Sequence, residues 1–188
     1  MINDIATEPT SAEDVGSPGA RPTIAQRLSG VAAYIRSRGA RDRGMLAELR
    51  RVTPERIPPQ PFWEIVERYA VTPAEEDFFL RVVPAMVLCP HVRGTRPGRT
   101  LRSAGVSPAR LERWLRMNRP GALRECRRIL AQVKGGVDWG ELGRVLFQWD
   151  HPAYGPEQRR RLARDFYLST PSVDRNPDHT GAAHGDDE

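Results

Sequence analysis

The spacing of apolar residues constrains this chain more than any other feature of its sequence. In several segments apolar side chains recur every three or four residues, as in Trp139, Leu142, Leu146 and Trp149, and no segment alternates convincingly between apolar and polar residues. The first spacing places side chains on one face of an α-helix, whereas alternation is typical of a β-strand. Proline and glycine punctuate these segments. The sequence therefore predicts an all-α fold, a single bundle-like body of about seven or eight helices.

Several helix starts carry residues that cap the first turn. A Ser, Thr or Asp followed three residues later by Glu or Gln can satisfy the unpaired backbone N–H groups of that turn. Three such boxes are Thr23 with Gln26, Thr72 with Glu75, and Asp138 with Glu141. Pro84 lies inside the helix that starts after Thr72, and we expect it to kink or end that helix. The Trp and Phe residues stand in helical register, so we expect them, like Cys89 and Cys126, to occupy the core.

The positive charge of the chain is concentrated in its central part. Residues 1–20 carry four acidic and no basic residues, residues 171–188 carry five acidic residues and Arg175, and each segment has a net charge of −4. Subtracting both from the net charge of +5 leaves +13 for residues 21–170. We predict a disordered acidic leader over 1–20, an all-α domain over 21–170 with a possible subdivision near 90–99, and a disordered acidic tail over 171–188. No signal peptide or membrane span is expected, which favours a cytoplasmic protein.

The basic residues lie mainly on helix faces opposite the apolar stripes. Of 29 basic residues 28 are arginine, whose planar guanidinium suits phosphate. One such face is usually only a solvated helix surface, but its repetition on several predicted helices, with a basic loop over 90–99, predicts a groove that binds nucleic-acid backbones without reading sequence. We expect the acidic termini to shield this surface, so that deleting 1–20 and 171–188 tightens non-specific binding at low salt.

Residues suited to catalysis or to a cofactor are sparse. Asp138 is accounted for by its capping box, and Asp150–His151 lacks the further histidines of metal phosphohydrolases. The glycines between 94 and 98 lack the Gly-Lys-Ser/Thr ending of a phosphate-binding loop. The two cysteines form no Cys-x-x-Cys pair. The sequence therefore predicts no enzyme activity, no cofactor and no metal.

Four motifs occur in a fixed order between residues 24 and 168. They are GMLAELRR at 44–51, GRTLR at 98–102 followed by SPARLERWLR at 107–116, DWGELGRVLFQW at 138–149, and RRRLARDFY at 159–167. Together they resemble elements of the CasB family, the small subunits of type I-E CRISPR Cascade surveillance complexes.

The resemblance implies a role as well as a fold. It implies an all-α subunit without catalytic activity, whose partners are other Cascade subunits, the CRISPR RNA, and the target and non-target DNA strands. It also implies a homodimer within the complex that stabilises the R-loop, while a separate helicase–nuclease cleaves. R-loop formation is a nearly balanced exchange of duplexes, so sequence-independent contacts to a backbone are sufficient for such a role.

The candidate nucleic-acid contacts fall into two groups. Arg50, Arg51, Arg99, Arg102, Arg110, Arg113 and Arg116 are chosen by their positions in the motifs. Arg27, Arg124, Arg127, Arg128 and Arg164 are chosen by their predicted helix face alone.

Three other functions compete with this interpretation. A stand-alone DNA-binding regulator could place the helices around 107–134 as a helix-turn-helix, although Asn or Gln suited to reading bases is missing at the start of its second helix. A nuclease would depend on Asp138 or Asp150. An adaptor would use the arginine faces to bind acidic proteins.

Overall fold

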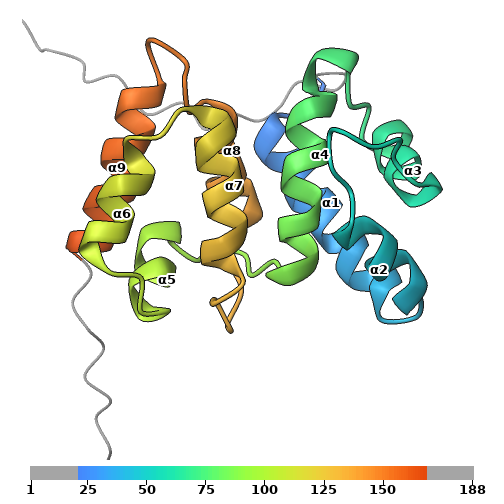
Figure 1. The fold of residues 1–188 in the computed structure, drawn as a ribbon, viewed down its shortest axis with the longest axis horizontal. Helices are drawn as coiled ribbons and strands as arrows, with labels where there is room; N and C mark the ends of the chain where they lie inside the picture. The colour runs from blue at the N-terminus through green and yellow to red at the C-terminus, as the bar shows by residue number, and fades with distance from the viewer. Residues whose placement is uncertain (1–20, 169–188) are drawn as a thin grey trace, which may run out of the picture.

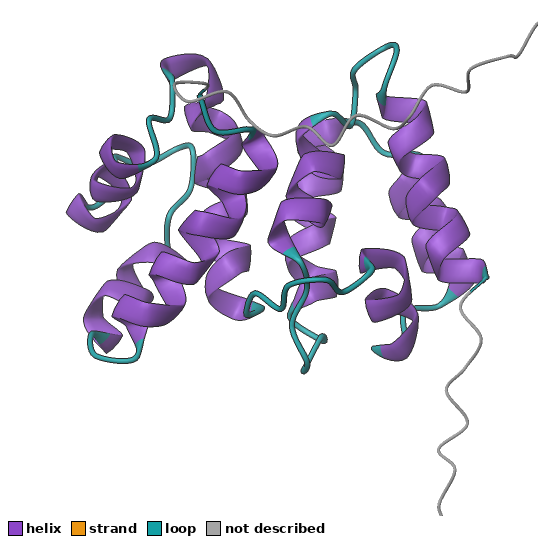
Figure 2. Cartoon of the chain, turned by 180° about the vertical axis from the view of Figure 1, so that it is seen from behind, coloured by secondary structure: helices purple, strands orange, loops and turns teal. Residues whose placement is uncertain are grey.

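The described part of the chain, residues 21–168, folds into α-helices joined by short loops. The computed structural model describes residues 21–168, and this part holds nine α-helices and no β-strand (Figures 1 and 2). The helices are α1 (Ile24–Gly39), α2 (Arg43–Arg50), α3 (Gln60–Arg68), α4 (Pro73–Leu88), α5 (Pro97–Ser103), α6 (Pro108–Leu115), α7 (Arg119–Leu130), α8 (Trp139–Phe147) and α9 (Gly155–Tyr167). The all-α prediction is confirmed, while the predictions for 1–20 and 171–188 lie outside the described residues. None of the nine helices is long and apolar enough to cross a membrane.

The helix that the sequence did not predict is α5. It has seven residues, and Leu101 is its one large apolar side chain, so an apolar stripe could not reveal it. The prediction of a loop over 90–99 is therefore wrong at its end, because residues 97–99 already belong to α5.

The predicted helix starts are largely confirmed. Thr23 accepts a hydrogen bond from the backbone N–H of Gln26 (3.3 Å), whose side chain accepts one from the N–H of Thr23 (2.8 Å). The Glu75 carboxylate likewise accepts from the N–H of Thr72 (2.9 Å). The third box is only half formed: Asp138 caps α8, but the Glu141 carboxylate turns away to basic side chains of α8 and α9.

Pro84 does not end its helix. α4 continues to Leu88, although a proline inside a helix removes one hydrogen bond and costs about 3 kcal/mol. The residues on both sides of Pro84, Val82, Val83, Ala85 and Met86, are all buried. Burial of these side chains offsets the cost of the missing hydrogen bond.

Helices α7 and α8 join two ends of the molecule. Figure 1 shows α1 to α4 at one end, α5, α6 and α9 at the other, and α7 with α8 between them. Glycines allow the closest approaches: a side chain at Gly140 would collide with Ser29 of α1, and one at Gly98 would collide with the backbone of α9 at Leu162. The possible subdivision near 90–99 stays a prediction.

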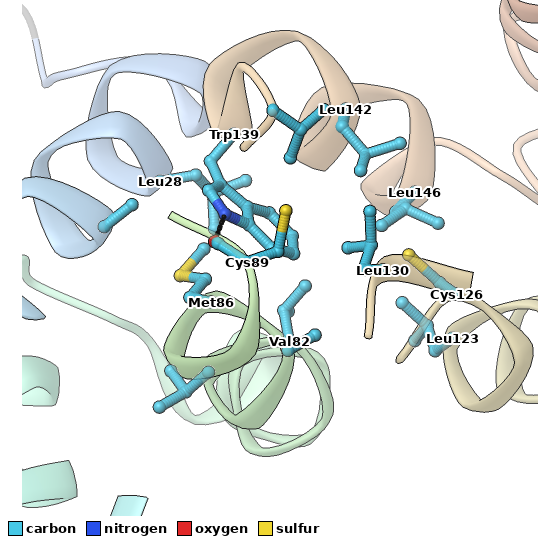
Figure 3. Close-up of a cluster of buried hydrophobic side chains, with 14 of the residues drawn as sticks. Leu28, Val82, Met86, Cys89, Leu123, Cys126, Leu130, Trp139, Leu142 and Leu146 are labelled. Carbon is cyan, nitrogen blue, oxygen red and sulfur yellow. Dashed lines mark hydrogen bonds between the residues drawn. The ribbon is translucent and has the colours of Figure 1, made fainter. Parts of the chain in front are cut away.

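Three buried tryptophans anchor the core. Trp114, Trp139 and Trp149 are fully buried. Each indole N–H donates to a backbone carbonyl at 2.8 Å, that of Ala122, Cys89 and Met117 respectively (Figure 3 shows the second). The core positions predicted for these tryptophans are therefore confirmed. Because each indole N–H is hydrogen-bonded, its burial costs little free energy.

Among the remaining core predictions, those for the phenylalanines are confirmed, since Phe62, Phe78, Phe79 and Phe166 are buried and Phe147 packs half-buried against the core. Cys89 and Cys126 face the core (Figure 3), and burial raises the pKa of both thiols, that of Cys89 to about 11. The prediction for Trp63 is wrong, because this side chain is 43% exposed. It lies on α3 at the edge of the molecule, and its indole N–H donates to Pro58 O (3.1 Å).

Candidate nucleic-acid interface

A surface cavity of about 760 Å³ lies between α5 and the turn that follows α7. Three basic side chains line it, Arg96, Arg99 and Lys134, and none of the residues that line it is acidic. Its other polar side chains are those of Thr95, Thr100, Ser103 and Gln132. Several cations around a concave surface without carboxylates favour an anionic ligand such as phosphate. We call this site the basic cavity.

Close packing of α5 against α9 orients the arginines of α5. A side chain at position 98 would collide with the carbonyl of Leu162, so α5 can lie this near to α9 only because residue 98 is glycine. Leu101 is also fully buried. Successive residues of a helix are rotated by about 100°, and Arg99 and Arg102 consequently lie on the exposed side.

Hydrogen bonds between two distant segments fix one wall of the basic cavity. Two bonds join the backbones: Val92 N–H donates to Val137 O (3.0 Å), and Val137 N–H donates to Pro90 O (3.0 Å). Three more involve side chains. Trp139 N–H donates to His91 Nδ1 (3.1 Å), Asp138 N–H donates to Thr95 Oγ1 (2.7 Å), and Gly94 N–H donates to Asp138 Oδ2 (2.7 Å). These bonds hold residues 90–95 beside residues 137–139. The cavity is therefore built on a hydrogen-bonded frame that the sequence prediction of a basic loop did not include.

A second, smaller cavity adjoins the first. Its volume is about 240 Å³, and it shares Arg96 and Arg99 with the basic cavity while adding Arg164, Asp165 and Leu168 from α9 and its end. Arg96 and Asp165 form an ion pair of 3.8 Å, but the Arg96 side chain is 69% exposed, so this pair is weak. We call Arg96, Arg99, Lys134 and Arg164 the basic cluster.

Another group of predicted arginines lies where α2 meets α7. Arg127 donates to the backbone carbonyl of Arg50 (3.0 Å), which joins two helices far apart in the sequence. Arg124 and Arg127 also line a groove of about 220 Å³ beside the segment that follows α2. None of the ion pairs within residues 21–168 involves Arg50, Arg51, Arg124 or Arg127.

A carboxylate of α7 compensates two of the arginines around α6. Glu125 forms ion pairs with Arg110 (2.9 Å) and Arg128 (3.5 Å), whereas the pair of Arg116 with Glu112 (3.8 Å) is exposed and as weak as that of Arg96. Arg113 is exposed and joins none of the ion pairs of residues 21–168. An arginine that already has a carboxylate partner gains less from a phosphate, so this predicted face is weaker than its sequence indicates.

The remaining arginine of α5 has an aromatic partner. The guanidinium of Arg102 lies over the ring of Phe166, 5.5 Å from its centre. This contact is a cation–π interaction between α5 and α9. Arg102 is exposed, so it takes part in packing while its charge still reaches solvent.

Arg27 corrects the sequence analysis. It was predicted to lie on an exposed face, yet its side chain is only 6% exposed. Its two terminal nitrogens donate to the two carboxylate oxygens of Glu75, one of them at 2.9 Å. Chiefly through these bonds, and through those from Thr72, the pKa of Glu75 falls to about 2. Arg27 is thus a structural partner of Glu75, and we no longer count it among the candidate contacts.

Sequence reasoning missed two members of the basic cluster, Arg96 and Lys134. Arg96 stands one residue before α5, and Lys134 follows α7 in the turn that contains Gly135 and Gly136. Each is a single charge between helices, so no helix face indicates it. Lys134 is the one lysine of the sequence, which was the only feature that set it apart.

The carboxylates discussed as catalytic candidates have structural partners. Asp138 accepts backbone N–H groups from Gly94 and Gly140, and Asp150 accepts the N–H of Arg119 (2.8 Å). Residues 21–168 contain no group of three or more His, Cys, Asp or Glu side chains that could hold a metal ion. The arrangement supports binding of an anion, and it offers no assembled acid–base or metal site within these residues.

The first residue of α7, Arg119, is also hydrogen-bonded to other parts of the molecule. Besides the bond to Asp150, the Arg119 guanidinium donates to the carbonyl of Phe147 at the end of α8 (3.3 Å). A helix-turn-helix protein needs the start of its second helix open toward the major groove. Here that start packs against α8.

Comparison with known proteins connects the chain with one family. Residues 45–167 match the family described as CRISPR-associated protein Cse2. The chain is also similar to a protein of Escherichia coli (strain K12) named CRISPR system Cascade subunit CasB, with 26% identity over 162 residues that cover 78% of this chain and 98% of that protein. No solved structure matches the chain.

Proposed function

Because this chain belongs to the CRISPR-associated Cse2 family, we propose that it is a small subunit of a type I-E CRISPR Cascade complex in antiviral defence. The name of its E. coli relative, a Cascade subunit, supports this role. Its partners are then other Cascade subunits, the CRISPR RNA and the two DNA strands, and two copies act together in the cytoplasm.

Within that complex we assign nucleic-acid binding first to the basic cluster. The observation that carries this assignment is that Arg96, Arg99 and Lys134 line one cavity that contains no acidic residue. Arginine presents several N–H donors in a planar fork that matches phosphate oxygens, and lysine adds a mobile charge. The arginines at the junction of α2 and α7 form a second contact region, which differs in that Glu55 also lines its groove.

Such contacts fit the energetics of an R-loop. The RNA–DNA duplex that forms is about as stable as the DNA duplex that it replaces, so modest contacts to a backbone can shift the balance. Phosphate contacts hold a strand without reading its bases. Trp114, Trp139 and Trp149 are buried and are not available for stacking on bases. The role requires no chemistry from this subunit, and we propose that it is not an enzyme.

A binding experiment with matched variants tests this function. The purified protein is titrated against fluorescent single-stranded and duplex DNA of unrelated sequences, about 20 nucleotides long, over a series of salt concentrations. We expect sequence-independent binding, and we expect Arg96→Gln with Arg99→Gln to weaken it about tenfold and to reduce the slope of log K against log salt by roughly 1.5.

The control changes the same charge in a compensated region. The double variant Arg110→Gln with Arg128→Gln removes two arginines that share the largely buried carboxylate of Glu125. We expect it to lose less than threefold in affinity, as exposed and already paired charges contribute little. Equal losses in the two double variants, or no loss in either, would show that the basic cavity is not the contact site. Circular dichroism verifies that each variant is folded.

A further inference from the structure

The described part of the chain ends at the basic cluster. Leu168, the last described residue, lines the smaller cavity together with Arg96, Arg99 and Arg164. Its side chain is 68% exposed. The segment after Leu168 is therefore joined to the described part at the rim of the site to which we assign nucleic-acid binding.

The segment that follows has the opposite charge. Residues 169–188 contain five carboxylates and one basic residue, Arg175, a net charge of −4. The carboxylates are those of Asp174, Asp178, Asp186, Asp187 and Glu188. Complementary charge thus stands next to the basic cluster in the same chain.

The length of the segment is sufficient to reach the cluster. Asp174 lies six positions after Leu168, which an extended chain spans with roughly 20 Å. The twenty residues of the segment, treated as a flexible chain, have a root-mean-square extension of roughly 25 Å. A tether of this length gives its end an effective concentration in the millimolar range at a nearby site.

The segment lies outside the part that the chain shares with its family. The family match ends at residue 167, and 78% of this chain is enough to cover 98% of the E. coli relative. The acidic residues from Asp174 onward therefore lie beyond the range that the family match covers.

We propose that the acidic segment 169–188 docks on the basic cluster of its own chain and competes there with nucleic-acid backbone. The inference rests on the function proposed above. Each ion pair is exposed and weak, so a nucleic acid with many phosphates displaces the segment, whereas weaker anionic competitors do not. The segment thereby lowers non-specific binding and leaves strong binding within the assembled complex possible.

The first test does not involve nucleic acid. Lys134 is the one lysine of the sequence, and no residue that lines its cavity is acidic. A zero-length carbodiimide joins a carboxylate to an amine only where the two meet. We expect dilute full-length protein to yield an intramolecular product that joins Lys134 to a carboxylate of residues 174–188, identified by mass spectrometry. The product should decline as salt rises toward about 1 M, because the charges are then screened.

The result that would overturn docking is equally specific. Lys134 would then form no product with residues 174–188, or only products with residues 1–20. The variant Lys134→Arg keeps the charge but lacks the reactive amine, so it must abolish the product. This control confirms that the product is assigned to the correct amine.

The second test measures competition with two variants of equal charge. One neutralises Asp174, Asp178, Asp186 and Asp187 as Asn. The other neutralises Asp4, Glu8, Glu13 and Asp14 as the corresponding amides. Each raises the net charge from +5 to +9, because four carboxylates are removed. We expect the first to tighten binding of single-stranded DNA five- to tenfold at about 50 mM salt, and the second less than twofold.

The outcomes separate this inference from the proposed function. Equal tightening in both variants would indicate a general effect of charge and would refute a specific docking site. Tightening by the first variant that disappears when Arg96→Gln and Arg99→Gln are added would support docking on the basic cluster. If no form of the protein bound nucleic acid while the Lys134 product persisted, the proposed function would fail and docking would stand.

Discussion

Arginine performs opposite tasks at the two ends of this molecule. In the contact between α1 and α4, Arg27 is buried and both terminal nitrogens bind the Glu75 carboxylate. On α5, Arg99 is exposed, lines two cavities and joins none of the ion pairs of residues 21–168. The residue type is the same, and the presence of a carboxylate decides between the two tasks. Where a carboxylate binds it in a buried pair, arginine stabilises the fold, and where arginine is exposed with no partner or only a weak one, it can receive an external anion.

The largest effect that we expect concerns the buried pair. Arg27→Met keeps much of the apolar stem but leaves the Glu75 carboxylate without its main partner. Breaking a buried ion pair by removing one member costs about 3–5 kcal/mol. Glu75 keeps its bonds to Thr72, so we expect a loss of about 3 kcal/mol in the free energy of unfolding, measured by urea denaturation.

The matched control for this change lies in the basic cluster. Arg99→Met makes the same replacement at an exposed site, and we expect the free energy of unfolding to change by no more than about 0.5 kcal/mol. Similar losses at both positions would break the distinction between a structural and a functional arginine.

The same pair makes stability depend on pH. The pKa of Glu75 is about 2 in the folded protein, below its ordinary value of 4.5. A lowered pKa stabilises the folded state above pH 4.5, and this contribution disappears as the pH falls from 4.5 toward 2. Its size is roughly 3 kcal/mol, since one pKa unit corresponds to about 1.4 kcal/mol. Urea denaturation between pH 6 and pH 2.5 should show the difference between wild type and Arg27→Met shrinking over that interval, and a constant difference would contradict the assignment.

Features that depend on neighbouring residues of one helix could be predicted from the sequence better than features that depend on residues far apart in it. Caps at Thr23 and Thr72 and the burial of three tryptophans follow from spacing within one helix, and they were predicted correctly. Helix α5 was missed because seven residues around a single buried leucine give no stripe. Local patterns therefore predicted the fold class well and the shortest element poorly.

The site depends on contacts that no local pattern contains. Arg27 stands four residues before Val31 of the apolar stripe, yet the carboxylate that explains its burial lies 48 positions along the chain. In the same way, Arg96 and Lys134 line one cavity in a part of the molecule where residues 90–95 bond to residues 137–139. The sequence indicated that the arginines matter, and tertiary packing decided which of them are available.

A third prediction turns a compensated region into an uncompensated one. Glu125→Gln removes the carboxylate that pairs with Arg110 and Arg128, while the amide keeps its shape. If availability of arginine limits binding, affinity for single-stranded DNA should rise about three- to fivefold at low salt, with a steeper dependence on salt. Titrations at several salt concentrations measure both quantities. Unchanged affinity would mean that α6 and α7 do not contribute to the interface even when their charges are released.

The smallest expected effect lies at Arg102, which both packs against another helix and exposes its charge to solvent. Its guanidinium stacks on Phe166, a contact worth about 0.5–1 kcal/mol, while its charge remains exposed. Arg102→Lys keeps the charge and removes the planar stacking group, so we expect unfolding to become easier by about 0.5 kcal/mol and DNA affinity to stay within twofold of wild type. Arg102→Met should lower stability similarly and also weaken binding two- to threefold. If the lysine variant instead lost as much affinity as the methionine variant, Arg102 would bind phosphate through its planar fork, and the aromatic contact would serve to orient it for that purpose.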